Sequence, residues 1–470
     1  MSMQRRTGER QEELWVPTTA MASAPGNPFY RKLNQLLREA DFDRKVECLC
    51  APFYAEGGRP SIPPGTYMRM LMVGYFEGID SERGIAWRCA DSLSLKEFLG
   101  YRPQDSTPNH SSLSRIRTRL DEETHRKAFN LVLAIVAEKG LLDGKALGVD
   151  STTMEANAAL RSIVRRDDGR GYEAFLQDVA KEAGVEEPTR EDLARIDRKR
   201  PKKGSNVEWK SPADPDARIT KMKDGSTHLA HAAEHAVDMK AGAIVSATVQ
   251  DATAGDPTTM LTTMQWAMEN LCAVLEDSAC DAELRPDLAT EWIADKGYHA
   301  NDTLEAIAGL GARSFISEPK RGKRRWRGRD EARAATYANR SRIAREKGKA
   351  HLRRRGELLE RSFAHTMESG AMRRAHLRGH SNISKRYLIH TAAFNLGLVM
   401  RSIFGKGTPR GLHGLRSAAQ ARVGALAAAF AAITRWKAKS EPRPRAISTP
   451  PHLTRAMHRR QREAASSTAC

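Results

Sequence analysis

Five short apolar runs, separated by helical patterns and one long polar stretch, limit how this 470-residue chain can fold. The runs lie at residues 146–150, 228–238, 244–249, 291–295 and 314–317. The second and third runs flank a turn at 240–242, and this pattern predicts a hairpin. Apolar runs of this length that alternate with helices predict an α/β fold, a mixed sheet with helices on both faces.

This order of elements is typical of a ribonuclease-H-like domain, and the chain around it changes in composition. Helical periodicity without strands precedes the sheet, and a stretch rich in Pro, Arg and Ser follows it. The expected parts are a disordered lead (1–27), an all-α domain (28–126), the α/β domain (127–405) with a helical insertion (160–226) and a basic segment (319–356), and a basic, partly disordered tail (406–470).

Two of the apolar runs end on an aspartate, Asp150 and Asp295. Each side chain should lie at the carboxyl edge of the sheet, where an acid is rare unless it is paired, hydrogen-bonded or metal-bound. A third carboxylate, Glu360, lies on a later predicted helix. Three such carboxylates supply the hard oxygen ligands that two divalent cations require. For either aspartate alone, a satisfied structural acid stays the alternative.

Nearby acids are weaker candidates for the same role. Glu155 lies five residues beyond Asp150, so in an extended strand it points to the opposite face. Glu357 lies one turn before Glu360 on the same predicted helix and is its main rival. Asp143 precedes the first strand and is a predicted turn residue.

Three histidines in one predicted strand resemble a ligand cluster. In an extended strand, however, His228 points to the face opposite to His231 and His235. We therefore expect these side chains to pack or to form hydrogen bonds rather than to bind a metal. Asp256 is most simply the N-cap of a helix whose first residue is Pro257.

The chain has a net charge of +19, and the excess is concentrated in two places. Residues 319–356 hold 16 Lys and Arg against three acids, and residues 401–470 hold 14 against two, so the remainder is mildly acidic. Two basic regions on such a body predict a polyanionic partner, most simply nucleic acid, bound at defined surfaces. The alternative is a solvated basic face or tail.

The sequence offers no apolar run long enough to span a membrane, and its N-terminus lacks the apolar core of a secretory signal. Six cysteines form neither a CxxC pair nor a zinc-type spacing, so free thiols in a reducing compartment are expected. Cys48 and Cys50 lie in an apolar run and are predicted to pack. These features predict a cytoplasmic protein.

The all-α domain ends in a cap-rich loop at 105–112, followed by a helix that carries Arg115, Arg117 and Arg119. Short helices joined by tight turns and closed by a basic helix fit a DNA-binding unit of the helix-turn-helix kind. A helical oligomerisation domain would show the same pattern, so this alternative stays open.

Taken together, these stretches resemble bacterial insertion-sequence DDE transposases with an InsH-type helical N-terminal domain. The resemblance is nearly continuous from about residue 28 to 405. The matching stretches are residues 59–119, 148–157, 294–299, 360–364, 373–374, 377–379 and 393–396.

The resemblance implies that Asp150, Asp295 and Glu360 are the catalytic triad and bind two Mg²⁺ ions, for which Mn²⁺ can substitute. It implies double-stranded DNA as the partner, both as terminal inverted repeats and as target DNA, with a homodimer on the DNA. The expected DNA contacts are Arg115, Arg117, Arg119, Arg324, Arg325, Arg327, Arg329, Arg361, Arg373 and Arg374.

The chain departs from the family pattern around the third carboxylate. Many relatives carry Lys or Arg seven residues after the glutamate, where Met367 stands here. A Tyr-x-x-Arg pattern that usually lies just before the glutamate is represented by Tyr337 and Arg340, 20 residues from Glu360.

The predicted function is metal-dependent cleavage at the ends of an insertion sequence, followed by strand transfer into target DNA. Two alternatives stay open at this point. One is a nuclease of the ribonuclease-H fold that performs no strand transfer. The other is a DNA-binding relic or repressor whose catalytic site is inactive.

Overall fold

The computed structural model describes residues 26–55, 57, 61–200, 204–222, 225–277, 287–320, 322 and 324–411. All of these residues belong to one compact unit that spans Met1–Leu412. The predictions made for most of the lead, for Cys280 and Cys470 and for most of the tail lie outside the described residues.

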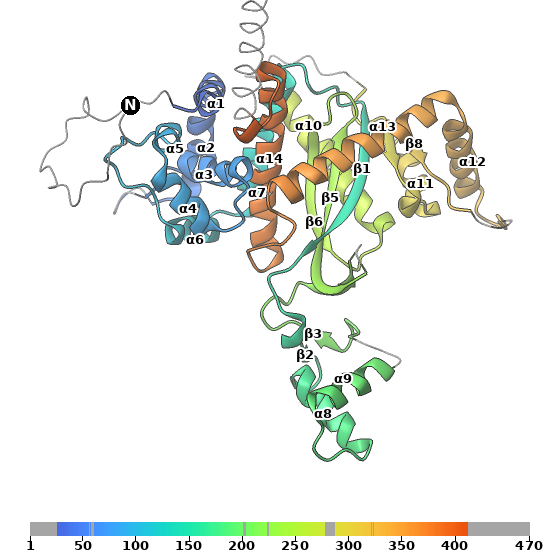
Figure 1. Ribbon diagram of the computed structural model, residues 1–470. Coiled ribbons are helices and arrows are strands. Elements are labelled where there is room, and N and C mark those ends of the chain that lie inside the picture. Colours follow the sequence, from blue (N-terminus) through green and yellow to red (C-terminus); the bar gives the residue numbers. More distant parts are fainter. Residues whose placement is uncertain are drawn as a thin grey trace, which may run out of the picture. The chain divides into compact units, whose positions relative to one another are not determined.

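Seven helices form the helical region, which Figure 1 shows in blue to green. They are α1 (Pro28–Glu39), α2 (Phe42–Cys50), α3 (Pro64–Glu77), α4 (Glu82–Asp91), α5 (Leu93–Phe98), α6 (His110–Arg119) and α7 (Glu122–Glu138). Several start where the sequence supplies a cap, because a side-chain oxygen there accepts an N–H group of the first turn. Ser81 caps α4 and Asn109 caps α6 in this way.

The sheet contains the strands expected from the apolar runs. Its members are β1 (Ala146–Glu155), β4 (Arg218–Lys221), β5 (Thr227–Asp238), β6 (Ile244–Asp251), β7 (Glu291–Ala294) and β8 (Arg313–Ile316), in the order β4-β5-β1-β7-β8 with β6 also on β5. β5 is antiparallel to β1, β4 and β6, whereas β1, β7 and β8 are parallel. The prediction of a mixed sheet is confirmed, although β1 extends five residues beyond Asp150.

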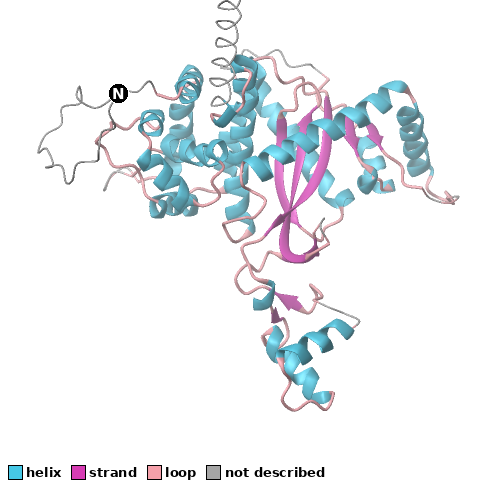
Figure 2. Ribbon diagram, in the orientation of Figure 1, coloured by secondary structure: helices cyan, strands magenta, loops and turns pink. Residues whose placement is uncertain are grey.

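Helices cover both faces of this sheet (Figure 2). α10 (Asp256–Glu276) packs on β5 and β6, while α13 (Glu346–Phe363) crosses β8, β7, β1 and β5. α14 (His380–Phe404), almost wholly buried, contacts β6, α3 and α7, so it joins the sheet to the helical region. α11 (Asn301–Gly309) and α12 (Asp330–Ala344) pack beside β8. The fold is thus α/β and ribonuclease-H-like, with an N-terminal helical region.

The segment between β1 and β5 has small cores of its own. It contains η3 (Leu160–Ser162), β2 (Val164–Arg165), α8 (Tyr172–Glu182), α9 (Arg190–Lys199) and β3 (Trp209–Lys210). Trp209 is the centre of one cluster, and Leu176 packs with Leu193 in another. β4 also falls within residues 160–226, yet it pairs with β5 in the main sheet.

Two further findings concern predictions made from the sequence. Cys50 is buried as expected, but the packing predicted for Cys48 is wrong because its side chain is exposed on the other side of α2. None of the helices in the described part of the chain is long and apolar enough to cross a membrane.

Candidate active site

The register of the parallel strands brings Asp150 and Asp295 to the same level of the sheet. Gly148 on β1 pairs with Ile293 on β7, so Asp150 lies two residues further along β1 and Asp295 lies one residue past the end of β7. Neighbouring strands run about 4.8 Å apart. The two acids therefore lie side by side at the carboxyl end of β7, while β1 continues to Glu155.

Arg355 on α13 supplies a cation at this edge. Its Nη2 lies 2.8 Å from Asp150 Oδ2, and its Nε donates to the Val149 carbonyl at 3.1 Å. The side chain is only 11% exposed, so most of the guanidinium is shielded from solvent. Asp150 thus has a fixed positive neighbour on the face of the sheet that α13 covers.

A third acid at the edge is Asp256, which the sequence analysis placed wrongly as a helix cap. The N-cap of α10 is Gly255, and Asp256 is the first residue of the helix with no capping hydrogen bond. Its Oδ1 accepts instead from Ser151 Oγ at 3.2 Å. Burial and the neighbouring charge of Asp295 raise the pKa of Asp256, while Ser151 and Arg355 lower it.

Gly297 lies between Asp256 and Asp295. A Cβ placed on Gly297 would be 2.5 Å from Asp256 Oδ2 and 3.0 Å from Asp295 Oδ1. The two carboxylate oxygens therefore approach one small space that no side chain fills. Asp295 also accepts the Gly297 N–H at 2.8 Å, which fixes the turn η4 (Lys296–Tyr298) that follows β7.

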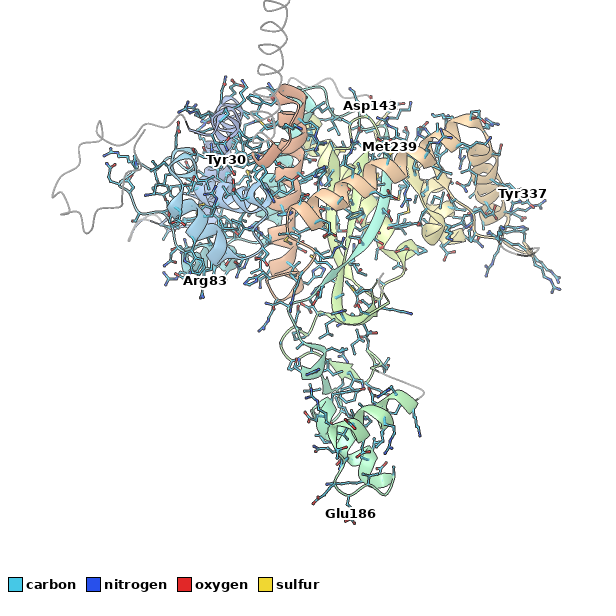
Figure 3. The ribbon with its side chains drawn as sticks, viewed as in Figure 1. Tyr30, Arg83, Asp143, Glu186, Met239 and Tyr337 are labelled. Atoms are coloured by element: carbon cyan, nitrogen blue, oxygen red, sulfur yellow. The ribbon has the colours of Figure 1, made fainter. Side chains whose placement is uncertain are left out.

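Glu360 does not join these acids in the described conformation. It is exposed on α13, where Arg355, Leu359 and Ser362 face the sheet. Helix geometry places it about 120° round from Arg354, which donates to the carbonyl of Met239. Met239, labelled in Figure 3, lies at the hairpin turn between β5 and β6. Glu360 is thus on the flank away from that turn. Its rival Glu357 is also exposed.

In the described ranges no three His, Cys, Asp or Glu side chains are placed to hold a metal ion. The residues nonetheless fit a hard cation, because the donors at the carboxyl edge are all oxygen atoms. Asp256 and Asp295 also approach a space that a Cβ on Gly297 would fill.

Glu234 holds the elements at this edge in place through hydrogen bonds. It is fully buried on β5, where it accepts hydrogen bonds from Thr259 at 2.9 Å, from Tyr298 at 2.7 Å and from Thr263. Thr259 and Thr263 belong to α10, and Tyr298 belongs to η4. One carboxylate therefore ties together the two elements that carry Asp256 and Asp295. Burial raises the pKa of Glu234 to about 7, against the opposing effect of the three hydroxyls.

Two of the three strand histidines form hydrogen bonds, one of the two roles that the sequence analysis expected. His231 meets Asp214 at 3.1 Å, and His235 lies between Ser362 at 3.0 Å and Tyr387 at 2.6 Å. His228 lies 3.6 Å from Glu155.

Glu155 points away from Asp150, as its place on the strand predicts. Its carboxylate also lies 3.6 Å from Arg374. Arg373, whose backbone pairs with the end of β1, bonds to Glu368 at 2.5 Å and to the Thr153 carbonyl at 3.3 Å. Arg361 is partly buried on α13.

Of the three arginines on α6, two are available to a partner and one is not. Arg115 and Arg119 are exposed and line a cavity of about 640 Å³ with the loop before the helix. Arg117, a predicted DNA contact, is instead bonded within the protein. Its guanidinium is ion-paired with Glu82 and bonded to Asn382, and only 11% of its side chain is exposed.

The arginines of the basic segment also differ in whether they are available to a partner. Arg324 is ion-paired with Glu318 at 3.1 Å and bonded to Asn301, so it too is engaged within the protein. Arg325, Arg327 and Arg329 are exposed. Next to them Tyr337, labelled in Figure 3, is half-exposed on α12, with the guanidinium of Arg340 4.9 Å from its ring centre.

Two family models match parts of the chain, one in the helical region and one in the later part of the α/β region. Residues 19–119 match the Transposase domain (DUF772), which covers the helical region up to the end of α6. Residues 316–399 match the Transposase DDE domain, which covers the basic segment, α13 and most of α14. No curated protein and no solved structure matches the chain.

Proposed function

The chain carries the helical and DDE domains of an insertion-sequence DDE transposase, an enzyme that acts on DNA, and from this premise we propose its reaction and its site. It cleaves phosphodiester bonds at the ends of its element and joins the freed 3′-hydroxyl groups to target DNA. The observation that carries this proposal is the register that sets Asp150 and Asp295 side by side at the carboxyl edge.

Asp150, Asp295 and Glu360 would hold two Mg²⁺ ions, and Mn²⁺ can substitute because it accepts the same oxygen ligands. When bound, such ions activate the attacking hydroxyl and stabilise the charge on the leaving oxygen. Glu360 lies five residues beyond Arg355, about 7.5 Å along the helix axis. What supports Glu360 is that it lies on the same helix as Arg355, which touches Asp150.

The protein's own side chains prepare this edge for a polyanion. Arg355 offsets the charge of Asp150, and Glu234 fixes the elements that carry the other acids. A phosphate that approaches the acids needs cations beside it, because like charges repel. Arg325, Arg327 and Arg329 are exposed just beyond β8, the strand next to β7.

We assign recognition of the element ends to the helical region, with Arg115 and Arg119 as its contacts. Both arginines are exposed on the last turns of α6 beside a loop rich in Ser, Thr and Asn. Arg361 on α13, and Arg373 and Arg374 near the end of β1, remain proposed contacts. A homodimer on the DNA would let two active sites act on the two ends of one element.

The test is a joining assay with labelled element-end DNA, target plasmid and Mg²⁺ or Mn²⁺. We expect nicking at the end and covalent joining of that end to the target, and both should stop when EDTA removes the metal. Nicking without joining would instead indicate a nuclease. Specific end binding without metal-dependent nicking would indicate a relic or repressor.

A further inference from the structure

We propose that Asp256 is a fourth metal-binding carboxylate of the active site, and that Gly297 keeps open the space in which its cation binds. The proposal rests on the proposed function, because it extends the same metal site. It adds a ligand from α10, on the face of the sheet opposite to α13, to the three carboxylates already assigned.

The first argument is the direction of the two oxygens of Asp256. Oδ1 accepts the hydrogen bond from Ser151 Oγ, which follows Asp150 directly on β1. Oδ2 is the atom nearest to the position of a Gly297 Cβ. One oxygen therefore fixes the side chain while the other is directed at the space beside Asp295.

The second argument is the absence of a side chain at residue 297. Gly297 has no positive φ, so its backbone conformation does not require glycine. An alanine there would bring a methyl group within 2.5 Å of Asp256 Oδ2 and 3.0 Å of Asp295 Oδ1. Real Cβ atoms essentially never come as close as 2.5 Å to another atom, so the carboxylate of Asp256 would have to move. What glycine provides at this position is space between two carboxylates, and a cation is the group that such a space suits.

The third argument is the cation already present at the edge. Arg355 is nine-tenths buried, and its Nη2 has no well-aligned hydrogen-bond acceptor although it lies 2.8 Å from Asp150 Oδ2. Its charge also acts on Asp256. A buried guanidinium directed at these acids shows that their combined charge attracts positive charge at this edge.

The alternative is a purely structural role for Asp256, because an acid in the first turn interacts favourably with the helix dipole. That role explains neither Gly297 nor the approach of Asp256 to Asp295. The two roles also predict opposite changes in stability. Removal of a dipole partner destabilises metal-free protein, whereas removal of one of two neighbouring like charges stabilises it.

The experiment is a calorimetric titration of the full-length protein with Mn²⁺ alone, after dialysis against EDTA and then metal-free buffer. The variants are Asp256→Asn, Asp295→Asn and Gly297→Ala. The matched control is Asp302→Asn, which removes an exposed acid from the first turn of the neighbouring helix α11. Thermal unfolding in EDTA is measured for each variant.

We expect Asp256→Asn and Gly297→Ala each to weaken Mn²⁺ binding at least about tenfold, and Asp302→Asn to leave it unchanged. Asp256→Asn should also raise the melting temperature in EDTA. Gly297→Ala keeps every charged group, so its loss of binding reports on the space itself. If Asp256→Asn does not fold, Asp256→Ser, which keeps an oxygen at the start of α10, replaces it.

The outcomes separate this inference from the proposed function. Mn²⁺ binding that is weakened by Asp295→Asn but not by Asp256→Asn or Gly297→Ala overturns the role of Asp256 and leaves the proposed function intact. Binding that none of the variants weakens overturns the metal site itself. A lowered melting temperature with unchanged Mn²⁺ binding in Asp256→Asn establishes the structural role instead.

Discussion

The helical region and the sheet neutralise buried charge by different means. In the helical region, arginines are ion-paired: Arg69 is almost fully buried against Asp43 at 2.7 Å, and Arg117 is ion-paired with Glu82. In the sheet, Glu291 is ion-paired with Lys347 in the same way, but Glu234 is held by three neutral hydroxyl groups. Asp238 likewise accepts only backbone N–H groups, from 143, 144 and 240.

The difference matters for the potential that each region produces. An ion pair cancels its own field, so the paired arginines of the helical region add little to the attraction of DNA. Neutral donors stabilise a carboxylate without cancelling its charge. The charge of Glu234 therefore stays uncancelled beside the carboxyl edge when this group is ionised, above a pKa of about 7, whereas Asp238 lies at the other end of β1, opposite Leu147.

The largest expected effect is on end cleavage, when one carboxylate at this edge loses its charge. Asp150→Asn, Asp295→Asn and Glu360→Gln should each reduce end cleavage at least about a thousandfold, because an amide is a poor ligand for a hard cation. Binding to end DNA should persist in a gel-shift assay. Glu357→Gln is the control from the same exposed helix. Activity lost in Glu357→Gln and kept in Glu360→Gln would move the third carboxylate by one turn.

The next effect tests the paired charges of the helical region. Glu82→Gln leaves the nearly buried Arg117 without its partner, which should cost about 3 kcal/mol in the free energy of unfolding. Urea titration measures this change. A double variant with methionine at both positions should recover most of the loss, since two apolar side chains leave no unpaired charge. No recovery would mean that Arg117 is needed for its bonds to Asn382 and Ser114.

A smaller effect tests the neutral donors around Glu234. Its pKa is raised to about 7, so between its unfolded value and pH 7 the folded protein keeps a proton that the unfolded chain has lost. Stability from this group is therefore present at low pH and declines as the pH rises towards 7. Glu234→Gln should remove this decline, about 2 kcal/mol, from urea titrations in EDTA between pH 5 and 8. An unchanged pH profile would show that Glu234 is ionised throughout.

The smallest effect per residue concerns the cations of the basic segment. Replacement of Arg325, Arg327 and Arg329 by Ala should flatten the slope of log affinity against log salt by about 2 to 3 units, equally for end and random DNA. Arg324→Ala is the control, because Arg324 is ion-paired with Glu318. A slope that responds only to Arg324 would mean that this ion pair opens when DNA binds.

Much of the fold was predictable because it depends on local patterns. Apolar runs predicted the strands and set Asp150 and Asp295 at the same level of neighbouring strands, as the register shows, although β1 does not end at Asp150 but continues to Glu155. The spacing of apolar residues along α6 also indicates that Arg117 contacts the rest of the protein. Leu113, Ile116 and Leu120 define the buried face of α6, and Arg117 lies next to that face while Arg115 and Arg119 do not.

Other features depend on contacts that no local pattern carries. An aspartate followed by proline is typical of a helix start, so Asp256 was interpreted as a cap. Its contact with Ser151 and its approach to Gly297 arise from elements far apart in the chain. The hydroxyls around Glu234 likewise come from α10 and η4, and each threonine alone has no distinguishing signal.

The long insertion between β1 and β5 bears on how fast the protein folds. These two strands form the longest antiparallel pair of the sheet, from Leu147 opposite Asp238 to Glu155 opposite Ala230, yet residues 156–226 separate them. Closing so long a loop costs chain entropy before any strand contact compensates, and such non-local pairing slows folding. The insertion has cores of its own around Trp209 and Leu176, so early collapse there would shorten the open loop. Packing around Trp209 should therefore affect how fast β1 pairs with β5, although Trp209 lies in a separate core.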